Sequence, residues 1–225
     1  TANRMHRRFL YETNVGAGLP IIDTLQNLFK SGDKLTGFYG IMSGSLSYIF
    51  GRLDEGVSFS RAVIEAREKR YTEPDPRDDL AGLDVARKAL IIAREAGISL
   101  ELEDITMHNV FPEGFDSTGT IEEFLNKLPQ VDDYFAKKVS DLKKQGKVLR
   151  MAASIEEGKV SVGMIEVDEN NPLYGIRGGE NAFVFHTARY TPIPMTIRGY
   201  GAGASVTAAG VFGAILRTVS WNPDK

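Results

Sequence analysis

Four strand-like segments follow one another between residues 147 and 199, after a region in which apolar residues recur at helical spacing. They read KVLRMAASIE (147–156), KVSVGMIEVD (159–168), NAFVFHTARY (181–190) and PIPMTIRG (192–199). The Glu156-Glu157-Gly158-Lys159 junction suits a hairpin turn, which joins antiparallel strands. Helices that precede a run of strands indicate an α+β fold, here a mostly antiparallel sheet with helices packed on one face, and not a doubly wound fold.

Apolar periodicity predicts helices for most of the chain before residue 147. We expect helices over 19–33, 43–56, 58–70, 78–97, 120–128 and 131–146, strands over 34–42 and 104–111, and a last helix over 204–220. Ser43 is a plausible N-cap of the second helix, and Gly32 and Gly97 end two others. No internal repeat or low-complexity linker divides the chain.

The composition is that of an ordinary globular protein, with 42% hydrophobic and 25% charged residues among 225. A net charge of −3, with both signs well mixed, gives no electrostatic footprint for nucleic acid or an anionic membrane. No apolar run reaches the roughly 18 residues of a membrane span, and the start has no secretory apolar region. Because there is no cysteine, disulfides, thiolate zinc sites and a cysteine nucleophile are excluded. We expect a cytoplasmic protein that binds neither nucleic acid nor membranes.

The segment YTEPDPRDDLAGLDVARK (71–88) is unusually rich in charge and proline. Glu73 and Asp75 each precede a proline, which disfavours helix, so the segment should begin as an extended, rigid loop. A helix should start after this loop. Asp78 or Asp79 is expected to cap it.

Farther along the same segment, Asp84 and Lys88 are four residues apart and share one face of the expected helix. Such a pair is most often a solvent-exposed ion pair of small energy. Apolar residues crowd this helix, however: Leu80, Leu83, Val85, Ala86, Ala89, Leu90, Ile91, Ile92 and Ala93. In a cleft, a lysine held by a carboxylate would be a candidate proton donor.

Two glycine-rich runs stand before helices, NVGAGLP (14–20) and RGYGAGASVTAAG (198–210). Gly199, Gly201 and Ala204 match the pattern G-x-G-x-x-A between a strand and a helix. Only 21 residues follow Ala204, which leaves no second strand and no acidic ribose ligand for a dinucleotide-binding unit. The runs are therefore read as tight turns, or as places where backbone approaches a ligand or neighbouring domain closely.

Several segments together resemble the homoserine dehydrogenase family, and within it the C-terminal part of bifunctional aspartokinase/homoserine dehydrogenases. They are ETNVGAGLPII, GIMSGSLSYIFGRLDEG, YTEPDPRDDLAGLDVARK, NPLYGIRGGENAFVF and GYGAGASVTAAGVFGAILRTVSW. The resemblance implies NADP- or NAD-dependent reduction of L-aspartate 4-semialdehyde to L-homoserine, a step toward threonine and methionine. It does not discriminate between the two cofactors.

The same resemblance implies roles for individual residues. Lys88 matches the proton donor to the nascent alkoxide, Asp84 its partner, and Glu73 the ligand of the substrate ammonium group. The family's further substrate contacts correspond here to Tyr71, Asp79, Gly44 and Ser45. The family's glycine that approaches the cofactor corresponds to Gly203. In the family, one loop holds a monovalent cation, usually sodium, mainly through backbone oxygens. The residues of this chain that match that loop are Glu12, Val15, Ala17 and Leu19.

The resemblance also implies a domain organisation. Residues 1–203 match the substrate-binding, catalytic and dimerisation domain, which forms a homodimer through its sheet. Residues 204–225 match a helix that returns to a nucleotide-binding domain, which we expect, like an aspartate kinase, in a longer parent chain. The alternative is a non-catalytic amino-acid-binding or dimerisation module of the same fold. The intact Asp84 and Lys88 pair favours the enzyme.

Overall fold

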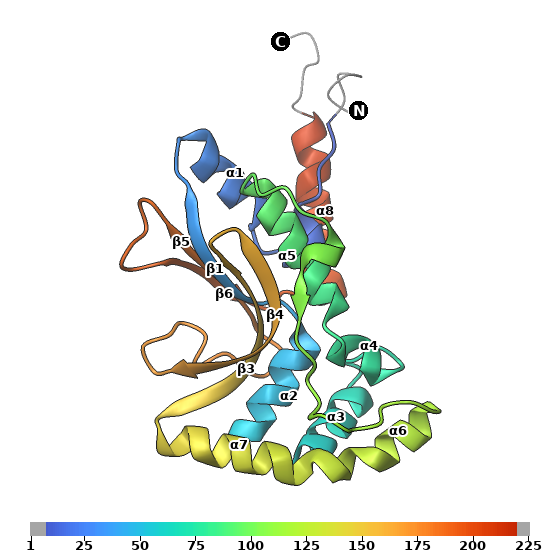
Figure 1. Ribbon diagram of the computed structural model, residues 1–225. Helices are drawn as coiled ribbons and strands as arrows, with labels where there is room; N and C mark the ends of the chain where they lie inside the picture. The colour runs from blue at the N-terminus through green and yellow to red at the C-terminus, as the bar shows by residue number, and fades with distance from the viewer. Residues whose placement is uncertain (1–7, 220–225) are drawn as a thin grey trace.

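A six-stranded sheet organises the chain, with strand order β2-β4-β3-β1-β5-β6 (Figure 1). The structure is a computed structural model and describes residues 8–219. The strands are β1 (Leu35–Ile41), β2 (Thr106–Met107), β3 (Lys147–Glu156), β4 (Lys159–Asp168), β5 (Asn181–Thr187) and β6 (Met195–Gly199). Every neighbouring pair is antiparallel except β2 with β4, which is parallel. The predicted α+β class with a mostly antiparallel sheet is confirmed.

The hairpin between β3 and β4 forms where the sequence predicts it. The register runs from Lys147 opposite Asp168 to Glu156 opposite Lys159. Glu157 and Gly158 form the turn with φ of +50° and +77°. Positive φ at both central residues is what a type I′ turn requires, and its twist matches that of the strands.

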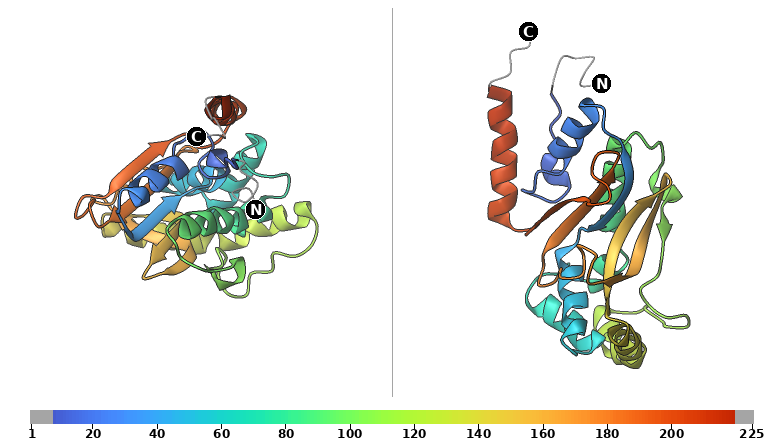
Figure 2. Two further views of the ribbon diagram at one scale, coloured as in Figure 1. Left: turned by 90° about the horizontal axis from the view of Figure 1, so that it is seen from above. Right: turned by 90° about the vertical axis from the view of Figure 1, so that its left-hand side faces the viewer.

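Helices cover one face of this sheet (Figures 1 and 2). The α-helices are α1 (Ile22–Lys30), α2 (Gly44–Asp54), α3 (Phe59–Glu68), α4 (Pro76–Leu80), α5 (Leu83–Glu95), α6 (Ile121–Lys127), α7 (Asp132–Lys144) and α8 (Ala204–Val219), with 3₁₀ turns at η2 (Glu12–Asn14), η3 (Leu102–Asp104) and η4 (Leu128–Val131). Helices α2, α5 and α7 pack on β3. Within residues 8–219, no helix is long and apolar enough to cross a membrane.

The main core lies between the sheet and these helices. Phe38 of β1 packs against Phe185 of β5 with ring centroids 5.2 Å apart, and Phe59 of α3 stacks on Phe135 of α7 at 4.0 Å. A smaller apolar cluster lies on the opposite face, where Leu173 of the 169–180 loop packs against strand residues. Burial of such side chains from water is the main stabilising term of the fold.

The helix expected over 78–97 is instead two helices, α4 and α5. Gly82 separates them with φ of +71°, and a side chain there would meet Met151 and Val162 at 3.2 Å. The expected cap is also wrong, because Asp75 caps α4 by accepting a hydrogen bond from the Arg77 N–H at 3.0 Å. Pro76 fills the first helical position, where its missing N–H costs nothing. Four expected strands (34–42, 104–111, 181–190 and 192–199) are shorter than predicted, the first by one residue at each end.

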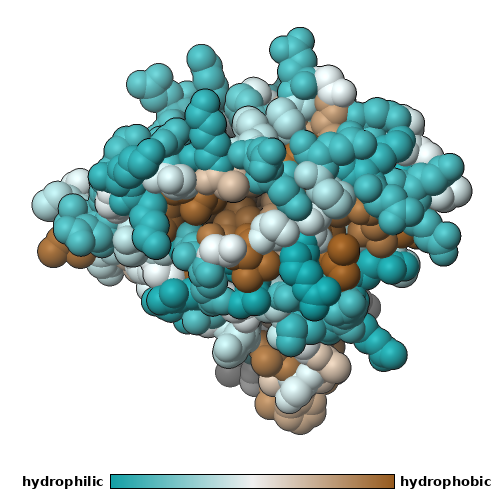
Figure 3. All heavy atoms as spheres, turned by 90° about the horizontal axis from the view of Figure 1, so that it is seen from below, coloured by the Kyte–Doolittle hydropathy of each residue, from teal (hydrophilic) through white to brown (hydrophobic). Residues whose placement is uncertain are grey.

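Helix α8 stands away from the sheet, beside the segment that leads into α1 (Figure 2). A Cβ added at Gly18 would lie 2.6 Å from Val206 Cγ1, and one at Gly210 would lie 2.6 Å from Thr13 Cγ2, so backbone and helix are in close contact. The rest of α8 presents apolar side chains to solvent (Figure 3), namely Val211, Phe212, Ile215 and Leu216, which are 44–60% exposed. Because the sheet that we expect this helix to cover belongs to another domain, we predict that α8 is mobile in the isolated chain or packs onto a neighbouring part.

Candidate active site

A cavity of about 510 Å³ opens where the N-terminus of α2, the 69–79 segment and α5 meet two glycine-containing loops. Its volume suits one small ligand. It brings together all eight residues predicted for catalysis, substrate and cofactor: Lys88, Asp84, Glu73, Tyr71, Asp79, Gly44, Ser45 and Gly203. These residues come from separate segments between 43 and 203, so their meeting is a property of the fold.

Lys88 lines the cavity, and its ammonium group is held by an oxygen of Asp84 and one of Met42. Its Nζ lies 2.7 Å from Asp84 Oδ2 and donates a hydrogen bond to the Met42 carbonyl at 3.0 Å. The Lys88 side chain is 22% exposed and that of Asp84 63%. An ammonium group has three N–H donors, and these are the two acceptors it finds within residues 8–219. One donor of Lys88 is therefore available to an oxygen of a bound ligand.

Asp79 ties the charged loop to helix α2. Its Oδ1 accepts a hydrogen bond from the Ser45 hydroxyl at 2.6 Å, and its Oδ2 accepts one from the Glu73 N–H at 2.8 Å. Burial raises the pKa of Asp79, and these two hydrogen bonds oppose the rise. The arrangement sets the position of Glu73 in the loop.

The loop itself is held rigid from outside the cavity. The Arg77 guanidinium bonds the Asp75 carboxylate at 2.6 Å and donates to the Ser117 and Gly119 carbonyls at 3.0 and 2.8 Å. Hydrogen bonding to Arg77 lowers the pKa of Asp75 below its usual value. The exposed Glu73 carboxylate, by contrast, makes no hydrogen bond or ion pair within the part of the chain the structure describes.

The N-terminus of α2 forms another wall of the cavity. Ser43 caps this helix, and its hydroxyl accepts a hydrogen bond from the Leu46 N–H at 3.3 Å. At Gly44 a Cβ would lie 3.3 Å from the Gly179 carbonyl oxygen. The first turn thus lies close to the 178–179 loop, and its N–H groups favour a negatively charged ligand atom.

The cavity also contains residues that the sequence reasoning missed: Ser43 as a lining residue, Lys69, Arg70, Gly178, Gly179, Tyr200 and Ala202. The Gly178-Gly179 pair lies inside the segment NPLYGIRGGENAFVF, and the Lys69-Arg70 pair directly precedes the charged segment 71–88, which is a signal of position only. Neither pair has a spacing that indicates a ligand.

The four residues predicted to hold a cation lie apart from this cavity, in the loop before α1. The Glu12 carboxylate caps α1 by accepting hydrogen bonds from the N–H groups of Ile22 at 2.8 Å and Asp23 at 2.7 Å. Burial raises the pKa of Glu12, and those bonds oppose the rise. The capping role was not predicted, and it arises because Ile21 at the N-cap has no oxygen to offer.

Backbone oxygens of the same loop differ in their hydrogen bonding. The Leu19 carbonyl accepts a bond from the Ile21 N–H at 2.9 Å, whereas those of Val15 and Ala17 accept none among residues 8–219. Over the same residues, no group of three or more His, Cys, Asp or Glu could hold a metal ion. Any cation here would therefore depend on carbonyl oxygens together with Glu12.

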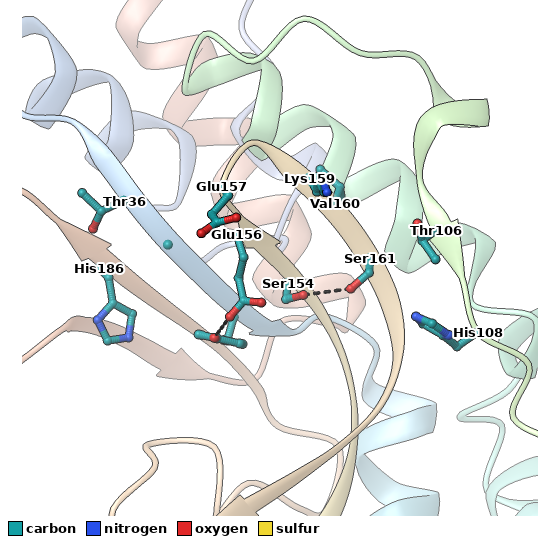
Figure 4. Close-up of a pocket in the computed structure, with 12 residues that line it drawn as sticks. Thr36, Thr106, His108, Ser154, Glu156, Glu157, Lys159, Val160, Ser161 and His186 are labelled. Atoms are coloured by element: carbon teal, nitrogen blue, oxygen red, sulfur yellow. Dashed lines mark hydrogen bonds between the residues drawn. The ribbon is translucent and has the colours of Figure 1, made fainter.

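A second hollow, of about 790 Å³, lies on the helix-free face of the sheet and contains none of the predicted residues. Figure 4 shows Glu156, Ser154, Ser161, His108 and His186 around it, with the Ser154 and Ser161 hydroxyls 2.9 Å apart. The Tyr39 hydroxyl hydrogen-bonds Glu156, and this bond raises the pKa of Tyr39 to about 12.

Comparison with known proteins decides the family. The family model described as homoserine dehydrogenase matches residues 20–216. The chain belongs to the homoserine dehydrogenase family. It is 57% identical over 218 residues to the bifunctional aspartokinase/homoserine dehydrogenase of Haemophilus influenzae, covering 97% of the chain and 27% of that protein. It is 41% identical to the homoserine dehydrogenase of Schizosaccharomyces pombe, covering 94% of the chain and 58% of that protein.

Solved structures agree with this membership. A putative homoserine dehydrogenase from Archaeoglobus fulgidus superposes with a TM-score of 0.77 at 26% identity, covering 96% of the chain and 60% of that structure. A hyperthermophilic archaeal homoserine dehydrogenase in complex with NADPH superposes with a TM-score of 0.68 at 25% identity, covering 95% and 56%. The chain thus spans about a quarter of the bifunctional relative's length and belongs to an oxidoreductase family.

Proposed function

We propose that this chain carries the amino-acid half of a homoserine dehydrogenase site, where L-aspartate 4-semialdehyde is reduced to L-homoserine with NADPH or NADH. The observation that carries the proposal is Lys88, held by Asp84 and the Met42 carbonyl with one donor left over, in the same cavity as Glu73. Family membership supports the reaction class. The NADPH complex of the archaeal relative supports a nicotinamide cofactor.

Lys88 acts on the oxygen of the aldehyde. A bound nicotinamide supplies the hydride to the aldehyde carbon, and negative charge then develops on the oxygen. A hydrogen bond from the free donor of Lys88 stabilises that charge, and transfer of its proton gives the alcohol. Asp84 keeps the ammonium group oriented while this happens. In homoserine oxidation the same steps run backward.

Glu73 binds the ammonium group of the amino acid. Its carboxylate has no other partner among residues 8–219, and its backbone is fixed by Asp79. An ammonium ion in a cavity needs a negative partner, because burying an unpaired charge is costly. Ser45, Gly44 and Tyr71 complete the wall on this side.

Glu73→Gln is expected to raise KM for L-homoserine about tenfold while leaving KM for the cofactor unchanged. The substitution keeps the shape of the side chain and removes its charge. Steady-state kinetics on the full-length protein measure both constants. Asp78→Asn, which removes the same charge from an exposed residue that does not line the cavity, is the matched control and should change neither. An increase in the cofactor KM instead would contradict this role of Glu73.

The cofactor is proposed to bind mainly through a nucleotide-binding domain of a longer polypeptide. The one parallel pair in the described sheet is β2 with β4, so residues 8–219 contain no βαβ unit of the dinucleotide-binding type. Gly203, with φ of +120°, lines the cavity at the start of α8 and is the proposed point of approach to the cofactor. The exposed apolar side chains of α8 are proposed to pack on the nucleotide-binding domain. Residues 1–203 are proposed to form the substrate domain. The aspartate kinase of the bifunctional relatives is likewise proposed for the parent protein.

The loop before α1 is proposed to hold a monovalent cation such as sodium. Hard cations prefer oxygen ligands. The unbonded carbonyls of Val15 and Ala17 and the carboxylate of Glu12 fit this preference, with Leu19 at the end of the loop. The cation would stabilise the close packing of this loop against α8.

A homodimer through the helix-free face of the sheet is proposed as the assembly, and a cytoplasmic location stays a prediction.

The isolated chain is expected to fold and dimerise but to show no dehydrogenase activity. Both apolar clusters lie within residues 8–219, so the core is complete. Sedimentation velocity and an NADPH-consumption assay measure the two properties. A monomer would contradict the proposed dimer, and measurable turnover would contradict the need for another domain.

A further inference from the structure

Helix α3 ends in a left-handed arginine. Arg70 has φ of +58°. The Tyr71 N–H bonds the Ala66 carbonyl at 2.9 Å and the Arg70 N–H bonds the Arg67 carbonyl at 3.0 Å, the pair of bonds of a Schellman motif. Helices α1, α2 and α5 end with the same pair of bonds, and their left-handed residues are Gly32, Gly56 and Gly97.

An arginine at this position is strained where glycine would not be. The left-handed conformation brings Cβ close to the following carbonyl in any L-residue but glycine. A cation near the C-terminus of a helix is favourable, yet Arg67 and Lys69 already supply one without positive φ. Strain of this kind gathers at functional sites. Arg70 is one of the residues that line the candidate active site.

The charges in the cavity are not all satisfied from within. Lys88 is paired with Asp84, and Asp79 accepts bonds from Ser45 and Glu73. Over residues 8–219, this leaves the carboxylate of Glu73 and the cations of Lys69 and Arg70 without an ion pair. An unpaired anion and unpaired cations in one cavity are complementary to a zwitterion.

We propose that Arg70 binds the α-carboxylate of the amino-acid substrate while Glu73 binds its ammonium group. The inference rests on the proposed function, and it gives the carboxylate a cationic partner in addition to the N–H groups at the N-terminus of α2. Arg70 and Glu73 are three residues apart, so their Cα atoms lie within about 11 Å. Both residues line the same cavity. A guanidinium group binds a carboxylate through two parallel hydrogen bonds, which fixes orientation as well as affinity.

Arg70→Gly and Arg70→Asn test the assignment in the full-length protein. Glycine and asparagine both accept the left-handed conformation, so each variant removes the guanidinium group without disturbing the turn. We expect KM for L-homoserine to rise at least about tenfold, with kcat and the cofactor KM nearly unchanged. The inhibition constant of 3-aminopropan-1-ol, which is homoserine without its carboxylate, should stay the same in both variants.

Matched variants separate the carboxylate contact from general effects of charge. Arg87→Gln removes a positive charge from an exposed residue outside the cavity and should leave KM for homoserine unchanged. Lys69→Gln should have a smaller effect than either change at Arg70. Thermal melting should place the Arg70 variants within a few degrees of the unaltered protein.

Three results would overturn the assignment of Arg70. They are an unchanged KM for homoserine in both variants, an equal loss of affinity for 3-aminopropan-1-ol, or a rise in the cofactor KM instead. If the unaltered protein does not oxidise homoserine at all, the proposed function fails and the assignment fails with it. If it does and the Arg70 variants behave like it, only the assignment fails.

Discussion

Lys88→Ala is expected to lower the turnover of L-homoserine at least about a hundredfold in the full-length protein, the usual scale for loss of a general acid or base. The structure gives the reason, because Lys88 is held between Asp84 and the Met42 carbonyl, and its third donor has no acceptor in the part of the chain that the structure describes. Steady-state kinetics in the direction of homoserine oxidation measure kcat. The fold should survive, since the lost ion pair involves an Asp84 side chain that is 63% exposed.

Arg87→Gln is the control for this prediction, since it changes the neighbouring residue outside the cavity. It should retain normal turnover and the same circular dichroism spectrum as Lys88→Ala. Near-normal kcat in a folded Lys88→Ala variant would remove Lys88 from the mechanism. A variant that fails to fold would show instead that Lys88 is a structural residue.

Asp54→Ala is expected to destabilise the fold by about 3 kcal/mol, because it leaves a buried arginine without its carboxylate. The Arg150 side chain is 2% exposed, and its guanidinium lies 2.7 Å from Asp54 Oδ2. Remaining bonds to the carbonyls of Leu149 at 2.9 Å, Leu173 at 3.3 Å and Tyr174 at 2.5 Å do not neutralise its charge. Thermal melting should show a decrease of roughly 6–12 °C, as expected for a domain of this size.

Glu55→Ala is the matched control for this stability prediction. Glu55 is the next residue along the chain and pairs with Arg52, but its side chain is 46% exposed. An exposed pair contributes at most about 1 kcal/mol. Equal melting temperatures for the two variants would contradict a structural role for the buried pair of Arg150 and Asp54, which joins α2 to the sheet.

The sequence predicted elements best where local signals sufficed. Glu157 and Gly158 specified a hairpin, because a two-residue turn fixes the register of its strands. The break between α4 and α5 was missed because one glycine inside an apolar helical pattern is ordinarily tolerated. Position 82 also has little room for a side chain, because Met151 and Val162 of the sheet approach Gly82 from distant segments.

Local sequence signals also predicted part of the candidate site. The spacing of Asp84 and Lys88 indicated a pair on one helical face, and family resemblance supplied the remaining residues. The Met42 carbonyl could not be predicted, because the packing of α5 on β3 and β4 brings Lys88 to it from a distant part of the chain. The strain at Arg70 was invisible as well, since it depends on how α3 ends in space and not on a motif.

The most direct test of the central claim is whether the purified full-length protein reduces NADP or NAD when L-homoserine is added. Calorimetry on the same protein measures the binding of homoserine. We expect cofactor reduction that depends on homoserine and is almost lost in Lys88→Ala, with homoserine still bound by that variant. Homoserine that binds without any reduction of either cofactor would contradict the account, and would favour a non-catalytic amino-acid-binding module of the same fold.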